Sequence, residues 1–335
     1  MNPVAQQRLF DPTVAFDHPA TPVLLGVIAA ALAIPPVVLF LAGRLGLMPA
    51  DRRRDVWRRY LPWLVIAPAA GAPVLLGAFW TVLAVAALGS FCFREYARAT
   101  GLFREKLVTY LTLLAMALVY LAALDNWLQL FHALFPLGIA GIVALSILQD
   151  RPKGYIQRAA LAVFAFALFG SCLGHLAHLA NDTHYRPLLL LVLLTVAVND
   201  VAAFIAGRLF GRRKLCPNTS PNKTVAGAVG AAAVTALVMW AAGRWVFTGT
   251  PLDHTGRLIA FGVLVSVAGQ FGDLVLSSIK RDLGLKDLDV LIPGHGGLLD
   301  RFDSLLLVAP VAFHFVNYFV GVGVGQPVCV FTGAR

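Results

Sequence analysis

The segment 277–303 combines dense mixed charge with a Gly-His-Gly-Gly turn, in a chain that is otherwise strongly apolar. Carboxylates bind divalent cations, Lys and Arg contact phosphate oxygens, and glycine lets backbone N–H groups approach an anion. The residues expected to carry this chemistry are Lys280, Arg281, Lys286, Asp287, His295, Asp300, Arg301 and Asp303. A solvated loop could carry the same charges but would have little need for the glycines. The segment therefore predicts a site for a polyphosphate and a metal ion.

Two further acids, Asp200 and Asp273, lie inside apolar segments, each about two helical turns from the expected cytoplasmic end. An ionisable group at membrane depth is costly, so it predicts a functional role with a partner. Ser277 and Lys280 follow Asp273 at i+4 and i+7, on one face of a helix. The alternatives are a structural ion pair for Asp273 and a helix-packing hydrogen bond with Asn199 for Asp200.

Between these acids, Ser220, Lys223 and Thr224 precede a segment rich in glycine and alanine. Ser220 or Thr224 could cap the helix that follows, and its N-terminus would then favour a phosphate, with Lys223 supplying charge. Capping alone is the competing interpretation. Gly227 and Gly230 are expected to permit close helix packing rather than to bind a ligand.

Composition excludes an ordinary soluble domain. Hydrophobic residues make up 59% of the 335 residues and charged residues 13%, and the mean hydropathy is +0.78. These values predict an all-α polytopic integral membrane protein. The formal net charge of +10 comes from Arg and Lys in the loops, so membrane topology explains it better than nucleic acid. The four cysteines show no metal spacing and are interpreted as small apolar residues.

Nine apolar segments recur along the chain. They are 22–43, 60–92, 107–124, 127–148, 158–180, 187–206, 224–246, 258–279 and 304–324. The second is too long for one crossing, because its 33 residues would span about 50 Å as a helix, against a hydrocarbon core of about 30 Å. Pro68, Gly71 and Pro73 at its centre predict a hairpin of two short helices, with one tilted or kinked helix as the alternative.

The distribution of Lys and Arg orients these segments. Five loops are rich in basic residues, namely 44–59, 93–106, 149–157, 207–223 and 280–303. Three are poor in them, namely 125–126, 181–186 and 247–257. By the positive-inside rule the first group faces the cytoplasm. With the hairpin, this predicts about ten transmembrane helices and both termini outside.

Two parts of the chain are expected from these patterns. Residues 1–185 would form N-terminal transmembrane helices, and residues 186–335 a transmembrane catalytic region with cytoplasmic loops 207–223 and 280–303.

The C-terminal half resembles the CDP-diacylglycerol synthase (phosphatidate cytidylyltransferase) family. The family pattern S-x-x-K-R-x4-K-D, a small residue, then P-x-H-G-G-x-x-D-R-x-D is matched by Ser277, Lys280, Arg281, Lys286, Asp287, Pro293, His295, Gly296, Gly297, Asp300, Arg301 and Asp303. Its D-x-x-A-Y/F, G-R/K-x-x-G and S-P-x-K-T-x-E-G blocks are matched by Asp200, Ala203, Phe204, Gly207, Arg208, Gly211, Ser220, Pro221, Lys223, Thr224 and Gly227. Three residues depart from the family: Asp289 replaces the small residue, Ala226 replaces the Glu of S-P-x-K-T-x-E-G, and Leu276 replaces an acid that is common after a G-D-L motif. These departures indicate a divergent member or paralogue.

The resemblance implies a transfer of the cytidylyl group of CTP to phosphatidic acid, which gives CDP-diacylglycerol and pyrophosphate. This is a step of phospholipid biosynthesis. It implies a bacterial-type inner membrane, an active site facing the cytoplasm, and CTP, phosphatidic acid and the bilayer as partners, without nucleic acid. A homodimer is an open expectation.

Roles are expected for individual residues. Asp273 and Asp300 would bind Mg²⁺, with Asp287 or Asp200 in support, and a second, monovalent cation is an open alternative. The catalytic set is Asp273, Lys280, Arg281, Asp287, His295, Asp300 and Arg301. The substrate-binding set is Ser220, Lys223, Thr224, Ser277, Lys286, Gly296, Gly297 and Asp303.

Other functions remain open. An ion-coupled transporter could use Asp200 and Asp273 as intramembrane ligands. A CTP-dependent enzyme could act on another lipid phosphate or a lipid alcohol, and a non-catalytic relative is the third alternative. His175 and His178 are spaced i,i+3 but have no nearby Cys or acid, so a metal role is not expected for them. His314 is expected to form an interhelical hydrogen bond.

Overall fold

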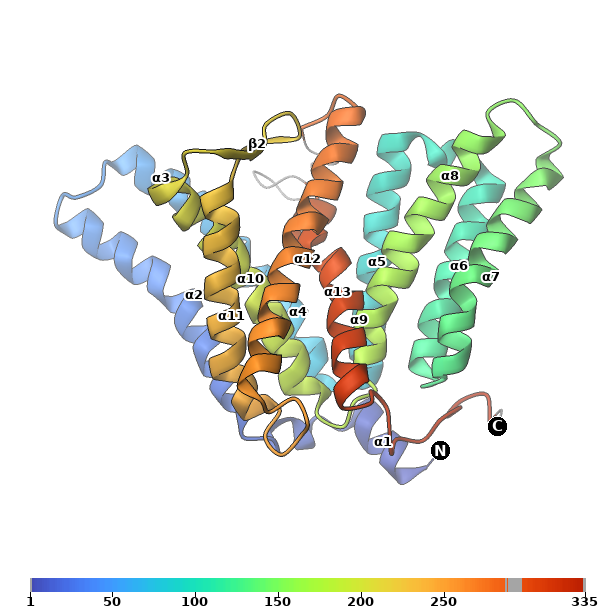
Figure 1. Cartoon of the computed structure of the whole chain (residues 1–335), viewed down its shortest axis with the longest axis horizontal. Helices are drawn as coiled ribbons and strands as arrows, with labels where there is room; N and C mark the ends of the chain where they lie inside the picture. Colours follow the sequence, from blue (N-terminus) through green and yellow to red (C-terminus); the bar gives the residue numbers. More distant parts are fainter. Residues whose placement is uncertain (1, 287, 289–296, 334–335) are drawn as a thin grey trace.

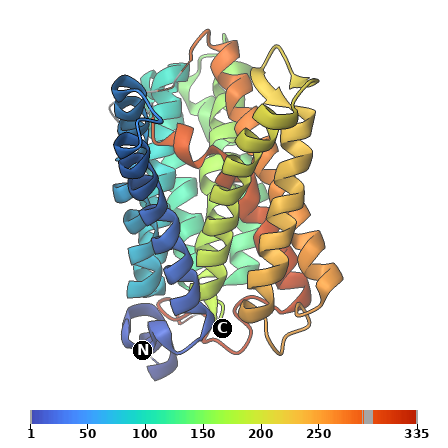
Figure 2. The same ribbon diagram turned by 90° about the vertical axis from the view of Figure 1, so that its left-hand side faces the viewer.

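The computed structural model describes residues 2–286, 288 and 297–333. It is a bundle of roughly parallel helices with one small two-stranded hairpin (Figures 1 and 2). Within the described ranges, ten helical spans are long and apolar enough to cross a membrane. The predicted all-α polytopic architecture is therefore confirmed.

The helices follow the apolar segments closely. They are α1 Pro3–Phe10, α2 Ala20–Arg44, α3 Ala50–Tyr60, α4 Trp63–Leu76, α5 Ala78–Thr100, α6 Lys106–Leu124, α7 Leu128–Ser146, α8 Tyr155–Ala165, α9 Leu173–Leu179, α10 Tyr185–Phe210, α11 Val225–Val246, α12 Thr255–Asp282 and α13 Leu299–Phe319. A π-helical segment at Phe166–Cys172 joins α8 to α9. The strands β1 Lys214–Cys216 and β2 Ser220–Thr224 pair antiparallel. The sequence patterns did not predict these strands.

The long second apolar segment forms two helices, as the hairpin prediction requires, but the break lies elsewhere. Pro68 and Pro73 lie inside α4, and the chain breaks at Gly77, whose φ is 144°. Such a φ is open to glycine and rare for other residues. Proline is tolerated inside a membrane helix because neighbouring groups satisfy the freed carbonyls. At the break itself, the Pro73 carbonyl accepts both the Gly77 N–H at 3.3 Å and the Thr81 hydroxyl at 3.1 Å.

The basic segments gather at one end of the bundle. Figure 1 places α3, the β1–β2 hairpin, the C-terminal end of α12 and the α7–α8 connection at that end. Both termini lie at the other end, as Figure 2 also shows. This agrees with the arrangement predicted from loop charge, because the Lys- and Arg-rich segments share one side.

Helices α10 to α13 pack in chain order and carry most of the predicted site. Small residues bring them close together. A methyl group at Gly227 would lie 2.7 Å from the Ala203 carbonyl oxygen on α10, so a larger residue would force α10 and α11 apart. The expected packing role of the α11 glycines is confirmed. Helix α13 also packs on α9 and α5.

Candidate functional site

Three carboxylates from three helices form the centre of the candidate site. We call Asp200 on α10, Asp273 on α12 and Asp303 on α13 the aspartate cluster. Asp303 interacts electrostatically with both of the others, and Asp200 with Asp273. Asp200 lies ten residues before the end of α10 and Asp273 nine before the end of α12, which is about 15 and 14 Å along each axis. The shared depth predicted from the sequence is confirmed.

Glycine explains how α13 comes so near to α12. A methyl group at Gly272 would lie 2.5 Å from the Asp303 carbonyl oxygen and 3.1 Å from that of Ser304. Such contacts are too short for any real side chain, so only glycine permits this approach. Because Gly272 directly precedes Asp273, the close contact also sets Asp273 beside Asp303.

Lys223 neutralises part of the aspartate cluster. Its ammonium group lies 2.6 Å from the Asp273 carboxylate and donates to the Gln270 carbonyl at 3.3 Å. Lys223 comes from β2, so the hairpin that follows α10 delivers this cation. The Ser277 hydroxyl donates to the other Asp273 oxygen at 3.2 Å. The predicted line of Asp273 and Ser277 on one helix face is confirmed, and a structural ion pair for Asp273 is present as well.

Thr224 ends β2 and caps α11. Its hydroxyl accepts a hydrogen bond from the Gly227 N–H at 3.1 Å, so the structure selects Thr224 over Ser220 as the cap. Thr224 is buried and lies against Gly207, which leaves its side chain no direct access to a ligand. Its contribution is to fix Lys223, the preceding residue.

A buried polar network supports Asp200. Asn199 donates to the Asp200 carboxylate at 3.4 Å and accepts from Ser266 at 2.5 Å and from Thr235 at 3.4 Å. Ser304 on α13 donates to the same Asp200 oxygen at 3.4 Å. The hydrogen bond expected between Asn199 and Asp200 is therefore present, and it belongs to a network that joins α10, α11, α12 and α13.

A second ion pair lies between the C-terminal part of α12 and the start of α13. Lys280 donates to Asp300 at 2.7 Å, and both side chains are largely buried. The other Asp300 oxygen accepts the Gly297 N–H at 3.0 Å. Asp300 thus holds Gly297 against the first turn of α13. Lys280 also interacts electrostatically with Asp303, which links this pair to the aspartate cluster.

Glu95 on α5 is a site residue that the sequence patterns missed. It is 1% exposed, and its two oxygens accept the N–H groups of Leu298 at 2.8 Å and Leu299 at 2.9 Å. A methyl group at Gly297 would lie 2.5 Å from the Glu95 carboxylate. Glu95 therefore holds the first turn of α13. Glu95 is an acid five residues before the end of α5. It was not singled out because a loop was expected to begin at residue 93.

Helix α13 begins at Leu299, five residues before the predicted apolar segment. Asp303 and Ser304 therefore lie inside the helix, and Glu95 satisfies the N–H groups at its start. This places Asp303 in the aspartate cluster, whereas the sequence analysis assigned it to the substrate-binding set.

The remaining predicted residues are more dispersed. Arg281 is exposed and donates to the Thr219 carbonyl at 3.4 Å, Lys286 is exposed, and Ser220 lies at the start of β2. Arg301 lines an apolar cavity together with Asp200. The predicted residues Asp287, Asp289, Pro293, His295 and Gly296 lie outside the described residues.

The aspartate cluster offers oxygen ligands suited to Mg²⁺. Magnesium typically takes one or two protein carboxylates and completes its shell with water and substrate phosphates. Among the described residues, the one group of three or more candidate ligands whose ligand atoms all lie within 4.8 Å of one another is made of histidines. The aspartates therefore fit a cation shared with substrate oxygens better than a cage made of protein alone. Asp300 is already satisfied by Lys280 and backbone N–H groups.

An apolar groove reaches Asp200 of the aspartate cluster. Two adjoining cavities of about 420 and 180 Å³ share the lining residues Ile66, Ala70, Leu193, Phe302 and Leu305. The smaller cavity reaches Asp200 and Arg301. We call the two cavities the lipid groove. Their apolar walls and charged inner end match a molecule with a hydrocarbon tail and an anionic head.

Comparisons with known proteins agree over most of the chain. Residues 57–319 match the model of a family described as the cytidylyltransferase family. The uncharacterized protein YnbB of Escherichia coli K12 is 35% identical over 280 residues, which cover 81% of this chain and 90% of that protein. The phosphatidate cytidylyltransferase of Bacillus subtilis is 30% identical over 278 residues, 79% of this chain and 99% of that protein. That of Staphylococcus saprophyticus is 41% identical over 132 residues, 39% of this chain and 48% of that protein.

Proposed function

This chain belongs to the cytidylyltransferase family, and from that premise we propose that it transfers the cytidylyl group of CTP to phosphatidic acid. The products would be CDP-diacylglycerol and pyrophosphate. The setting would be a bacterial inner membrane, with the aspartate cluster facing the cytoplasm, where CTP is found. The basic residues gathered at that end of the bundle support this orientation.

One observation carries the proposal. Asp200 and Arg301 line the inner end of the lipid groove, and Asp200 links it to the rest of the aspartate cluster, to which Lys223 and Lys280 are bound or close. A lipid phosphate could therefore reach the same place as a nucleotide that enters from the aqueous end. A soluble substrate would have no need for the apolar walls.

The reaction needs charge neutralisation more than it needs a base. A phosphatidate oxygen attacks the α-phosphorus of CTP, a new P–O bond forms, and the bond to the β-phosphate breaks so that pyrophosphate leaves with the electron pair. Both reactants are anions and repel each other. Mg²⁺ held by Asp273 with Asp200 or Asp303 would supply Lewis acidity and orientation. Lys223 and Lys280 would contact phosphate oxygens, and Arg301 would hold the lipid phosphate.

The lysines are placed to serve this role. Lys223 uses one donor on Asp273 and one on the Gln270 carbonyl, and an ammonium group has three. The third can meet a phosphate without breaking the ion pair. Asn199, Glu95 and Thr224 act as positioning residues, since each fixes an element that carries a charged group.

A second candidate is the same transfer onto another lipid phosphate or a lipid alcohol. Its support is that YnbB, which aligns with 81% of this chain, is uncharacterized, and that Leu276 stands where the family commonly has an acid. Leu276 is fully buried in the hydrophobic core. This departure from the family pattern therefore leaves the aspartate cluster intact.

The test is a substrate panel with the purified full chain. Labelled CTP is supplied with vesicles that contain phosphatidic acid, an isoprenoid phosphate, an isoprenoid alcohol or phosphatidylcholine, and with ATP, GTP and UTP as competitors. We expect label in a lipid product and equimolar pyrophosphate with phosphatidic acid and CTP alone. Transfer to an isoprenoid acceptor only would select the second candidate. No transfer to any lipid, with CTP binding retained, would contradict both.

A further inference from the structure

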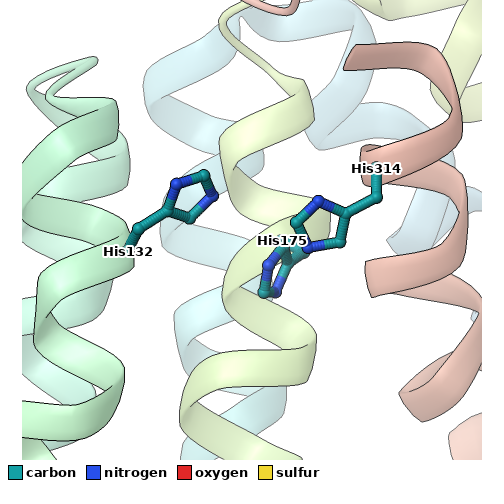
Figure 3. A group of neighbouring side chains, drawn as sticks. All are labelled: His132, His175 and His314. Carbon is teal, nitrogen blue, oxygen red and sulfur yellow. The ribbon is translucent and has the colours of Figure 1, made fainter. Parts of the chain in front are cut away.

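We propose that this protein carries a second metal site, formed by His132 on α7, His175 on α9 and His314 on α13, that binds a first-row divalent cation of the Zn²⁺ class. One ring nitrogen from each residue lies within 4.8 Å of the others. Figure 3 shows the three rings turned toward one another from three separate helices. We call this group the histidine cluster.

The three residues share one depth in the bundle. His132 is the fifth residue of α7, His175 lies four residues before the end of α9, and His314 lies five before the end of α13. Each is therefore about 6–8 Å from a helix end. On α13, His314 lies eleven residues after Asp303, or about 16 Å along the axis. The histidine cluster is thus distinct from the aspartate cluster and nearer to the opposite end of the bundle.

Hydrogen bonding prepares His175 as a ligand. Its Nδ1 lies 2.7 Å from the Ser171 carbonyl oxygen, which can only accept a hydrogen bond. Nδ1 must therefore carry the proton, and Nε2 is left with its lone pair. Metal-binding histidines typically use this arrangement, in which a carbonyl fixes the tautomer and orientation of the ring.

The surroundings favour a cation over a simple aromatic cluster. Phe131 and Phe313 pack edge-on against His175, with ring centroids 4.9 and 5.1 Å away. Neighbouring His178 is 0% exposed, and neither of its ring nitrogens has a hydrogen-bond partner among the described residues. Burying an imidazole in an apolar setting is costly unless its nitrogens are satisfied. A metal ion would satisfy the Nε2 lone pair of the buried His175 and would also engage the exposed His132 and His314.

The ligand set determines the class of metal. Neutral imidazole suits Zn²⁺, Cu²⁺, Ni²⁺ or Co²⁺, whereas Mg²⁺ and Ca²⁺ require oxygen. In a tetrahedral zinc site the ligand nitrogens are about 3.4 Å apart, from Zn–N bonds of about 2.0–2.1 Å. The exposed rings of His132 and His314 can rotate by the small amount needed to reach this. Three protein ligands leave a fourth position for water, and the metal would join α7 and α9 to α13.

The test measures Zn²⁺ and Co²⁺ binding to the full chain without a polyhistidine tag, after treatment with a chelator. We expect one ion per chain by elemental analysis, a higher melting temperature with metal, and a four-coordinate Co²⁺ spectrum. His132→Ala and His314→Ala should each weaken binding by at least about tenfold, since loss of a second-shell partner alone costs 10–100-fold. Both residues are exposed, so these variants should fold.

A matched control is the pair His18 and His184, whose ring centroids lie 4.9 Å apart and which belong to no group of three candidate ligands among the described residues. The double variant His18→Ala/His184→Ala should bind metal as the wild type does. Absence of stoichiometric binding by the wild type would overturn the proposal. So would binding that survives His132→Ala and His314→Ala together, or binding that the control variant loses equally.

Discussion

The two polar clusters of this molecule differ in almost every physical respect. The aspartate cluster is charged, is bonded to lysine and meets the inner end of the lipid groove at Asp200. The histidine cluster is built from imidazole ligands, of which His175 is buried against Phe131 and Phe313 while His132 and His314 are exposed. In the proposed reaction the first would exchange anionic substrates during each turnover. The second contains no carboxylate or lysine, so its metal would stabilise the packing of α7, α9 and α13. The comparison teaches that buried polarity in one membrane bundle can serve both chemistry and assembly.

The largest expected effect is on the aspartate cluster. Asp303→Asn keeps the size of the side chain but removes a negative charge, so we expect cytidylyl transfer to fall by about 100-fold or more, as for other losses of transition-state charge stabilisation. The measurement is the initial rate of label transfer at saturating CTP. Metal binding by the histidine cluster should be unchanged. Equal loss of both properties would show that the two clusters are not independent.

Glu95→Ala is expected to have the next largest effect. It leaves the N–H groups of Leu298 and Leu299 without their acceptor, which costs about 1–3 kcal/mol for buried groups. Activity should fall with stability, because α13 carries Asp303. Glu95→Gln keeps one acceptor oxygen and should restore part of both. Wild-type activity and melting temperature in Glu95→Ala would refute the positioning role.

Gly272→Ala tests the close approach of α12 and α13. The added methyl group would meet the Asp303 carbonyl at 2.5 Å, and such overpacking costs about 1–3 kcal/mol. We expect a lower melting temperature and slower transfer. The matched control is Gly141→Ala on α7, where nothing lies within 4 Å of the added group. That variant should be neutral or slightly stabilising.

Much of the fold followed from the sequence because apolar length and loop charge are local properties. These patterns were enough to predict about ten spans and to predict that the basic loops lie at one end of the bundle. The break was predicted near Pro68 and Pro73 because proline usually ends a helix. It lies at Gly77 instead, because a membrane helix tolerates internal proline. Asp200 and Asp273 stood out because they are acids inside apolar segments. Glu95 did not, because it lies near a helix end beside arginines.

The histidine cluster shows what local patterns cannot reach. His132 and His314 are far apart in the sequence, and their meeting depends on how α7, α9 and α13 pack. The i,i+3 pair His175 and His178 drew attention, but only His175 belongs to the group. The sequence therefore gave no reason to expect a metal here. Only the packing of α7, α9 and α13 brings His132 and His314 to His175.

The smallest expected effect comes from the opposite end of the bundle. His314→Ala should leave the rate of cytidylyl transfer within about twofold of the wild type in Mg²⁺ buffer, because His314 lies about 16 Å along α13 from Asp303. Its metal-dependent rise in melting temperature should disappear. A loss of transfer as large as that of Asp303→Asn would contradict the proposal that the aspartate cluster carries the reaction while the histidine cluster stabilises helix packing.

The central claim is that carboxylates from α10, α12 and α13 meet at one site that gathers two anionic substrates. The most direct measurement compares label transfer from CTP to phosphatidic acid by Asp273→Asn and by Asp253→Asn. Asp253 lies in the loop between α11 and α12 and pairs with Arg244 at 3.9 Å, so it serves as the matched acid outside the cluster. We predict that Asp273→Asn loses transfer by at least about 100-fold while Asp253→Asn retains it. Wild-type turnover by Asp273→Asn would contradict the account.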